Sequence, residues 1–424
     1  MRSGRALPWL AVALAALVWA VPLQLGFYSD AVITDIPTYR AAYEHIAAGG
    51  VPYVDFSLEY PPLAAALFWL AGVIPGDYTV VFSVLMALCL VAVVLGVLAI
   101  ARALDLDRRH QALAAAAVAL SPLLIGNLVE SRFDMALAAL LTWTLWAAVT
   151  ERWRLMWTLL AAATLLKVVP LILVPVLLIW QRHRDALRRA LVGLAWSLAV
   201  VVVAIAPFAI MSPSGTWDLA RYHLDRPLQI EATGSAYLLG LHAMVDVPIT
   251  VVNSYGSQGL DGTGPQVIAG LSTALLIALV VAIAAGFWIG LHRSRAPGDA
   301  RLLVAATAST VAALLVAGKV LSPQFLVWLV PLVFIVAGRY GPAAFGLGAA
   351  AMLATLAYFP HRYWDLVALH TPEIAILALR DTLLIALLAA CWPRADVSSR
   401  PQGRILPGQQ RDVERAVAAR YLVE

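Results

Sequence analysis

Charged residues are scarce in this sequence, and cysteine is nearly absent. Only 13% of the 424 residues carry a charged side chain, whereas a soluble domain carries about 25%. The two cysteines, Cys89 and Cys391, have no partner at the spacing of a disulfide framework or a Cys-based zinc site. No HExxH motif or paired-histidine spacing is present, so we expect neither a metal nor a cofactor. The low charge excludes a soluble globule.

Apolar residues make up 62% of the chain and fall in long runs. The runs are rich in Leu, Ala and Val and are roughly 15–25 residues long, which is typical of membrane-spanning helices. The first run is longer than the apolar core of a signal peptide, so we interpret it as an uncleaved span. The sequence therefore predicts an all-α polytopic membrane protein. The runs occupy residues 7–27, 79–101, 111–126, 134–149, 155–180, 190–211, 265–291, 301–318, 323–338, 342–359 and 373–392.

The arginines indicate how the chain is threaded through the membrane. The run 155–180 is flanked by Arg152 and Arg154 on one side and by four arginines between positions 182 and 189 on the other. Basic loops stay in the cytoplasm, and a single span cannot place both flanks there. We therefore predict that the run splits between Lys167 and Pro170 into two short helices. With this split the chain has about twelve spans, and both termini are cytoplasmic.

The spans define a transmembrane domain, residues 1–392, and a polar cytoplasmic tail, residues 393–424, with a short helix predicted at Val413–Leu422. Two long segments, 28–78 and 212–264, lie on the outer side of the cytoplasmic membrane. Within the first of them, the stretch 62–76 is apolar but too short to span. We predict that it forms a helix lying in the membrane interface.

Some basic residues lie on the predicted outer side, where the positive-inside rule does not expect them, so they require another explanation. The only two lysines, Lys167 and Lys319, each lie at the outer end of an apolar run. Ionisable groups at such positions are usually functional, although snorkelling to the interface is the alternative. Together these residues predict a cationic outer surface. The residues against the bias are Arg40, Arg132, Lys167, Arg221, Arg226, Lys319 and Arg362, and His223 and His361 lie in the same outer loops.

Asp35 is the first of several outer carboxylates. It precedes Pro37 and a predicted helix that ends at Gly49 and Gly50. One interpretation is an N-cap, in which the carboxylate accepts hydrogen bonds from free backbone N–H groups. The other is a general base at the membrane surface. The two are compatible, because the helix dipole would keep the carboxylate ionised.

The other outer carboxylates have structural alternatives as well. Asp55 and Glu59 bracket a Tyr- and Phe-rich turn that continues into Tyr60, and a solvated loop is the structural alternative for them. Arg132 and Asp134 lie in the sequence Glu-Ser-Arg-Phe-Asp at an outer turn, where a local ion pair could close the turn.

Carboxylates beside cations at the membrane surface fit a transfer reaction on a lipid-linked anion. A carboxylate can deprotonate an acceptor hydroxyl, and cations can stabilise a departing phosphate. The chain has no nucleotide-binding motif in a suitable context, which favours a donor that the lipid itself presents. Nucleic-acid binding is not expected, because the basic residues lie in short loops and not in a patch interleaved with aromatic residues.

Several motifs, in this order and spacing, resemble glycosyltransferase family 87. The resemblance covers roughly residues 5–392 and implies a GT-C fold, as in actinobacterial polyprenyl-phosphate-mannose-dependent mannosyltransferases. It implies an inverting transfer from polyprenyl-phosphate-mannose to a glycolipid or lipoglycan at the periplasmic or extracellular face, with Asp35 at the position of the family's catalytic aspartate. The motifs are Asp35-x-x-x-Tyr39, Gly50-Val51-Pro52-Tyr53-x-Asp55-Phe56, Glu59-Tyr60-Pro61-Pro62, His223-Leu-Asp225-Arg226-Pro-Leu-Gln and Lys319-x-x-Ser322-Pro323-Gln324.

We assign the remaining candidates by charge and position. The cations that oppose the topology bias are predicted to bind the donor phosphate, and the polar residues near them are predicted to contact the sugar or the acceptor. The phosphate-binding candidates are Lys319, Arg226, His223 and, more weakly, Lys167. The sugar and acceptor candidates are Glu59, Tyr60, Asp55, Arg132, Asp134, Gln324 and His361.

Two other classes of protein stay open at this point. A lipid transporter or flippase would place ionisable groups near the bilayer midplane and often contains repeats. Arg380 and Asp381, inside the last apolar run, favour that alternative, whereas the absence of an internal repeat does not. The second alternative is a non-catalytic subunit of an envelope-assembly pathway.

Overall fold

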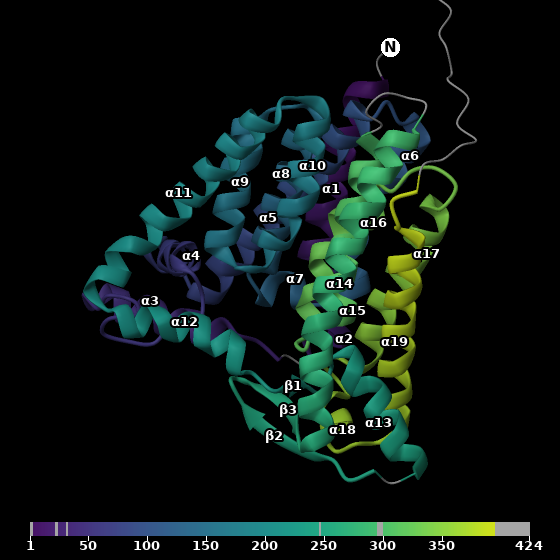
Figure 1. Cartoon of the computed structure of the whole chain (residues 1–424). Coiled ribbons are helices and arrows are strands. Elements are labelled where there is room, and N and C mark those ends of the chain that lie inside the picture. Colours follow the sequence, from purple (N-terminus) through teal and green to yellow (C-terminus); the bar gives the residue numbers. More distant parts are fainter. Residues whose placement is uncertain (1–2, 22–23, 31–32, 246, 295–299, 395–424) are drawn as a thin grey trace, which may run out of the picture.

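The computed structural model describes residues 3–21, 24–30, 33–245, 247–294 and 300–394. Most of these residues form helices that run between the two ends of the molecule (Figure 1). The predicted apolar runs reappear as these helices, and most of their ends agree within a few residues. The long helices are α1 (Ser3–Ala20), α5 (Tyr78–Ala103), α6 (Arg108–Ile125), α8 (Asp134–Val149), α11 (Leu187–Met211), α14 (Thr263–Arg293), α15 (Ala300–Ala317), α17 (Gly341–Tyr358) and α19 (Thr371–Ala390).

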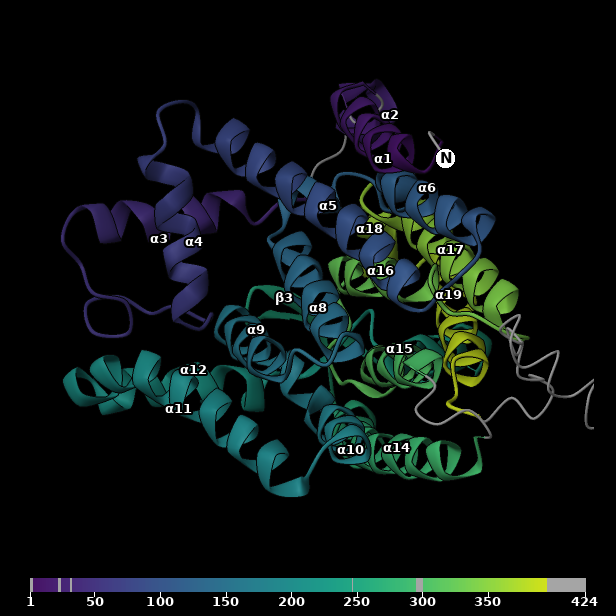
Figure 2. The same cartoon turned by 90° about the horizontal axis from the view of Figure 1, so that it is seen from above.

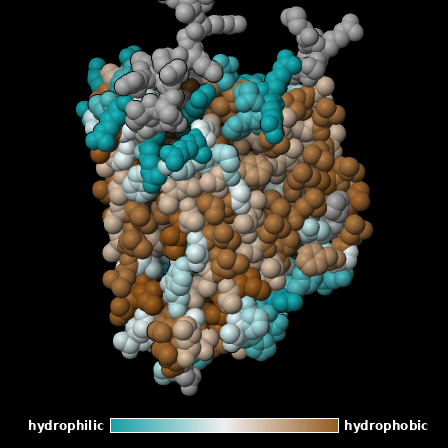
Figure 3. All heavy atoms as spheres, turned by 90° about the vertical axis from the view of Figure 1, so that its right-hand side faces the viewer, coloured by the Kyte–Doolittle hydropathy of each residue, from teal (hydrophilic) through white to brown (hydrophobic). Residues whose placement is uncertain are grey.

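Among the described residues, five helices are long and apolar enough to cross a membrane by themselves, namely α5, α11, α14, α15 and α17. Only 6% of the most apolar stretch of α11 is buried, and 11% of that of α14, whereas 72% of that of α15 is buried. Helices α11 and α14 therefore present apolar side chains outward, and α15 lies inside the bundle. Figure 3 shows an apolar band between two more polar ends. The count of about twelve spans stays a prediction.

The chain breaks at Lys167, as the arginine pattern predicts. Helix α9 (Trp153–Leu166) ends there, a 3-10 segment η2 (Val169–Leu173) follows, and α10 (Val174–Arg184) returns toward the start of α9. Pro170 and Pro175 lie in this turn and lack the N–H group that a continuous helix needs. At the open end of this hairpin, where α9 begins and α10 ends, Arg184 Nε donates to Glu151 Oε1 at 2.7 Å. The two arginine-rich flanks are therefore side by side.

The predicted span 323–338 differs from a regular helix. It consists of a 3-10 segment η3 (Pro323–Leu329), a single helical turn α16 (Val330–Val333) and a turn. Pro323 is the first residue of η3 and Pro331 is the second residue of α16, and each removes a backbone donor. Side chains of this segment, such as Trp328 and Leu329, are fully buried. Irregular backbone at membrane depth is tolerated where protein surrounds it.

The outer segments pack beneath one end of the bundle. The first contains α2 (Gly26–Ser29), α3 (Ile36–Ala47) and α4 (Pro62–Val73), so the apolar stretch 62–76 is helical as predicted. Figure 2 shows α3 and α4 crossing at the edge of the molecule. The second contains α12 (Pro213–Asp225) and α13 (Thr233–Val245). Two short helices, α7 (Leu128–Ser131) and α18 (Tyr363–Val367), lie at other outer turns.

A small antiparallel sheet, which the sequence did not predict, joins α12 and α13 to α14. Its strands are β1 (Leu228–Gln229), β2 (Thr250–Ser254) and β3 (Ser257–Asp261), in the order β1-β3-β2. Leu228 pairs with Leu260, and Thr250 pairs with Asp261. The β2–β3 turn consists of Tyr255 and Gly256, both with positive φ, as in the tight turns that match the twist of a hairpin.

A cluster of aromatic rings docks α3 against the bundle. The Tyr39 ring stacks on Phe68 of α4, with 4.4 Å between ring centroids, and contacts Phe82 of α5 and Phe133 beside α8. Tyr39 is only 1% exposed. Aromatic pairs of this kind contribute about 0.5–1.5 kcal/mol each beyond the area they bury. The start of α3, where Asp35 lies, is therefore held close to the end of the bundle.

The two ends of the described chain agree with the predicted topology. The start of α1 and the end of α19 lie at the same end of the molecule as the α10–α11 connection (Figure 1). The predicted helix at Val413–Leu422 lies outside the described residues. The division into residues 1–392 and 393–424 stays a prediction.

We expect Ser57→Cys to react with a membrane-impermeant maleimide in intact cells and Ala186→Cys to react only after the membrane is opened. Ser57 is an exposed residue of the first outer segment, and Ala186 is an exposed residue between α10 and α11. Both variants are made with Cys89 and Cys391 replaced by alanine. Labelling of Ala186→Cys in intact cells would contradict the threading of the α9–α10 hairpin.

Candidate functional site

A cavity of about 1000 Å³ lies where the outer segments meet the ends of α9 and α15. Its lining comes from parts of the chain that are far apart in sequence, including the start of α3, the Lys167 turn, the end of α12, the β2–β3 turn and the loop after α15. Most of the predicted site residues meet here. Those that line the cavity are Asp35, Glu59, Tyr60, Arg132, Lys167, His223, Arg226, Lys319 and Gln324.

Asp35 occupies the N-cap position of α3, but its side chain makes no capping hydrogen bond. Thr34 Oγ1 accepts the bond from the Ile36 N–H instead, at 3.1 Å. The Asp35 carboxylate is 3.1 Å from Arg132 Nε and accepts a 3.4 Å hydrogen bond from the Tyr39 hydroxyl. The capping interpretation is therefore wrong for this side chain, and the carboxylate is available to the cavity.

The surroundings of Asp35 favour proton acceptance. Burial raises the pKa of the Asp35 carboxyl above its usual value, and the nearby carboxylates Glu59 and Asp134 raise it as well. The Arg132 guanidinium acts in the opposite direction and lowers this pKa. A carboxylate with a raised pKa is a stronger base, provided that it is ionised at the working pH.

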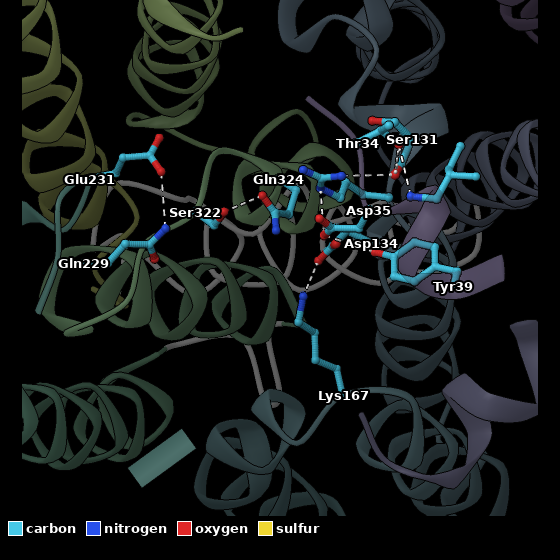
Figure 4. A network of polar contacts seen from close by, with 12 residues as sticks. Thr34, Asp35, Tyr39, Ser131, Asp134, Lys167, Gln229, Glu231, Ser322 and Gln324 are labelled. Carbon is cyan, nitrogen blue, oxygen red and sulfur yellow. Dashed lines mark hydrogen bonds and ion pairs between the residues drawn. The ribbon is translucent and has the colours of Figure 1, made fainter. Parts of the chain in front are cut away.

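The predicted local ion pair between Arg132 and Asp134 does not form. Arg132 pairs with Asp35, and Asp134 pairs with Lys167 at 2.8 Å between Oδ1 and Nζ. Trp328 Nε1 donates to the same Asp134 oxygen at 2.7 Å. Asp134 is buried behind the cavity surface, whereas Asp35 and Lys167 line it (Figure 4). The sequence suggested a contact within one turn, and the structure pairs each charge with a distant segment.

Lys167 lies among aromatic rings as well as beside Asp134. Its ammonium nitrogen is 4.7 Å from the ring centroid of Phe325, 4.9 Å from that of Trp328 and 5.1 Å from that of Phe133. Rings at these distances attract a cation. Because Asp134 already matches its charge, Lys167 is a weaker candidate for an external anion than the other cations of the cavity.

Three further cations line the cavity from the second outer segment and the loop after α15. Lys319 Nζ donates to the Leu224 carbonyl at 2.6 Å, and Arg226 donates to Ser257 Oγ at 2.8 Å. The His223 ring nitrogen is 3.1 Å from the Glu59 carbonyl. Among the described residues none of the three has a carboxylate at ion-pair distance. Their positive potential is therefore available to an anion.

Burial changes the protonation of two of these groups. It lowers the pKa of His223, which the neighbouring Arg226 charge lowers further. Burial also lowers the pKa of Lys319, although Asp225 opposes this effect. An anion bound between them would raise both pKa values, because an opposite charge favours the protonated form.

Besides Asp134, two predicted site residues, Asp55 and His361, lie outside the cavity lining. Asp55 Oδ2 accepts a 2.7 Å hydrogen bond from the Val51 N–H and closes an exposed turn. The His361 ring bonds the Phe27 carbonyl at 2.6 Å and stacks on the Phe27 ring, with 4.7 Å between centroids. Asp55 therefore closes a local turn, whereas His361 joins a late outer turn to the first outer segment. They were placed in the site because they share the outer side with it, which is not sufficient.

The structure adds site residues that the sequence analysis missed. Glu231 and Gln229 line the cavity although both are almost fully buried. Gln229 Nε2 donates to Glu231 Oε2 at 3.2 Å, and the Tyr358 hydroxyl donates to Oε1 at 2.9 Å. Figure 4 shows this pair on the far side of Ser322 and Gln324 from Asp35. Burial raises the pKa of Glu231 to about 7, against the lowering effect of Arg380. The only signal in the sequence is that Glu231 lies two residues after Gln229, the last residue of a family motif.

Arg380 and Asp381, which the sequence left as candidates for a transport pathway, form a buried ion pair. Arg380 Nε is 2.7 Å from Asp381 Oδ1, and both side chains are fully buried in α19. The Arg380 guanidinium also donates to the Glu231 carbonyl. Neither residue lines the cavity. The pair therefore supports the loop that carries Glu231.

We expect Asp134→Leu to lower the free energy of unfolding by about 3–5 kcal/mol, because it leaves the largely buried Lys167 charge without its partner. Thermal unfolding of the purified protein in detergent measures the effect. Arg40→Gln, which breaks the exposed Arg40–Glu44 pair, is the control and should cost about 1 kcal/mol or less. Equal shifts in the two variants would show that the buried pair does not stabilise the fold.

Comparisons with known proteins can now be set beside this geometry. The sequence profile of Glycosyltransferase family 87 matches residues 58–323. Among solved structures, the chain is similar to ArnT from Cupriavidus metallidurans, in a crystal structure with bound undecaprenyl phosphate. That similarity has a TM-score of 0.46 and 16% sequence identity, and it covers 93% of this chain and 77% of ArnT. A comparison with curated proteins found no match.

Proposed function

The chain belongs to glycosyltransferase family 87, and from this premise we propose that it transfers mannose from a polyprenyl-phosphate donor. The acceptor is a hydroxyl of a glycolipid or lipoglycan, and the reaction takes place at the outer face of the cytoplasmic membrane within a GT-C fold. One observation carries the proposal, namely that Asp35 and three cations without carboxylate partners line the same cavity.

The proposed reaction is a single displacement with inversion. The acceptor oxygen forms a bond to the anomeric carbon while the bond from that carbon to the phosphate oxygen breaks. Asp35 takes the proton of the acceptor hydroxyl, and the polyprenyl phosphate leaves with the bonding electron pair. Arg132 is the positioning residue, because its guanidinium lies 3.1 Å from the Asp35 carboxylate and holds it in one orientation.

The leaving phosphate gains negative charge during this step. Lys319, Arg226 and His223 are the groups that we assign to it, since fixed cations stabilise charge that develops in the transition state. Lys167 contributes more weakly, because its ion pair with Asp134 holds it in the cavity lining and partly neutralises its charge. Glu59, Tyr60, Gln324 and the newly found Glu231 are suited to bonding sugar hydroxyls. These polar groups lie in the same lining.

The cavity also has an apolar side that supports a lipid-linked donor. Leu171, Ile172, Ile205, Leu276 and Leu314 line it together with the polar groups. A nucleotide sugar would need polar partners for a base and a ribose, whereas an isoprenoid chain needs apolar contact. The mixture of cations and aliphatic side chains therefore fits a phosphate attached to a polyprenyl tail.

Asp35→Asn should lower transfer by about 10²–10⁴-fold, because the amide keeps the shape of the side chain but cannot accept the acceptor's proton. The assay follows transfer of labelled mannose from polyprenyl-phosphate-mannose by the purified protein. Because burial raises the pKa of Asp35, wild-type activity should fall with decreasing pH before the range of a free carboxylate is reached. This acid limb reports the protonation of the base.

The control for this experiment is Asp55→Asn, which removes a charge from the same outer segment but outside the cavity. It should transfer at nearly the wild-type rate. If well-folded Asp35→Asn protein stays within about threefold of wild type, far short of the loss expected of a general base, another carboxylate must act, and Glu59 or Glu231 becomes the candidate.

Lys319→Ala should weaken donor binding by about tenfold or more and leave acceptor binding nearly unchanged, since a charged hydrogen bond contributes about 1.5–3 kcal/mol. Steady-state kinetics with each substrate varied in turn separates the two effects. Arg221→Ala is the matched control, because Arg221 lies on α12 near the site but pairs with Asp225 and does not line the cavity. Equal donor affinity in Lys319→Ala and wild type would refute the phosphate assignment.

A further inference from the structure

A second cavity of about 770 Å³ lies between α9, α10 and α11. It shares no lining residue with the first cavity. Lys167 ends α9 at the first cavity, and Trp153 and Arg154 begin the same helix at the second. At a rise of about 1.5 Å per residue the two ends of α9 are roughly 20 Å apart. The second cavity is therefore at the end of the hairpin that the arginine pattern assigns to the cytoplasm.

The lining of this cavity is positively charged. Arg154, Arg188 and Arg189 face a single carboxylate, Asp185, which pairs with Arg189. Within the described part of the chain, the structure records no ion pair for Arg154 or Arg188. Two arginines from different helices, α9 and α11, thus border one cavity without a carboxylate partner. Such a pair attracts an anion.

The walls of the cavity are fixed by hydrogen bonds and close packing. Trp157 Nε1 donates to Gln181 Oε1 at 2.7 Å and ties α9 to α10. Trp196 Nε1 donates to Thr158 Oγ1 at 3.0 Å and ties α11 to α9. A Cβ at Gly193 would lie 2.2 Å from the Trp157 ring, so only glycine permits this approach of α11 to α9. These contacts hold α9, α10 and α11 together around the cavity.

An apolar surface continues from the cavity along α11. Val192 is 62% exposed and Trp196 is 53% exposed, and both also line the cavity. The outward face of α11 continues in the same apolar manner toward Val203. Tryptophan is enriched at the level of lipid head groups, and basic pockets between helices on the cytoplasmic side bind anionic head groups.

We propose that this cavity binds the phosphate head group of an anionic phospholipid from the cytoplasmic leaflet. Arg154 and Arg188 hold the phosphate, and an acyl chain lies along the exposed face of α11. The apolar face beside the cavity is what distinguishes a lipid from a soluble phosphate. The site is separate from the transfer reaction and does not depend on the identity of the sugar or the acceptor.

The test uses the full-length protein purified in a neutral detergent and measures binding of phosphatidylglycerol by native mass spectrometry and by the shift in Tm. Phosphatidylcholine and inorganic phosphate are the comparison ligands. Wild-type protein should bind phosphatidylglycerol and gain thermal stability from it, and neither comparison ligand should match this effect. At about 1 kcal/mol for each arginine near a membrane surface, R154A/R188A should bind about 30-fold more weakly.

Arg109→Ala is the matched control, because Arg109 is an exposed arginine at the start of α6, outside the cavity. It should bind phosphatidylglycerol like the wild type. If the double variant does not fold, R154Q and R188Q keep the aliphatic stems, and each should bind about fivefold more weakly. Undiminished lipid binding in the arginine variants would overturn the proposal. An equal Tm shift with inorganic phosphate would overturn the lipid assignment in favour of a soluble anion.

Discussion

The buried ion pair between Lys167 and Asp134 connects the parts of the molecule that form the first cavity. Lys167 comes from the turn of a broken hairpin, Asp134 from the first residue of α8, and Trp328 from a 3-10 segment that donates to the same carboxylate oxygen. A charge at this depth is stable only with a partner of opposite sign and satisfied hydrogen bonds. Each of the three segments therefore has its position set by the other two.

This constraint explains where the backbone is irregular. The 3-10 segments η2 and η3 follow Lys167 and Ser322, and both border the cavity. Irregular backbone is unstable in contact with lipid but is tolerated where it lines a polar cavity or is enclosed by protein. The segments that break the helical pattern thus bring side chains of opposite charge to one place, and the surrounding regular helices seal them from the lipid.

The sequence predicted the elements better than the contacts between them. Hydropathy located the helices, because a membrane span needs a long apolar run. The arginines located the break at Lys167, because basic loops stay in the cytoplasm. The partners of Arg132 and Asp134 were missed, because sequence spacing indicates only local pairs and the real partners, Asp35 and Lys167, lie on other elements. Glu231 was missed for the same reason, since its side chain reaches the cavity only after β1 and α13 have packed. His361 is the converse case. The sequence analysis included it in the site, but it does not line the cavity, because residues on one face of a membrane need not share a cavity.

The shortness of the α9–α10 hairpin has a mechanical consequence for the surrounding bilayer. Its helices have 14 and 11 residues, which correspond to about 21 and 16 Å of length against a hydrocarbon thickness of about 30 Å. Where lipid contacts this hairpin, the bilayer would thin, or water would enter above it, to accommodate the hydrophobic mismatch. In the orientation that we propose, the Lys167 side of the first cavity would lie below the plane of the outer head groups. The phosphate of the proposed lipid donor would have to leave its neighbours in the leaflet to reach Lys167, and the energy of this step would depend on bilayer thickness and elasticity.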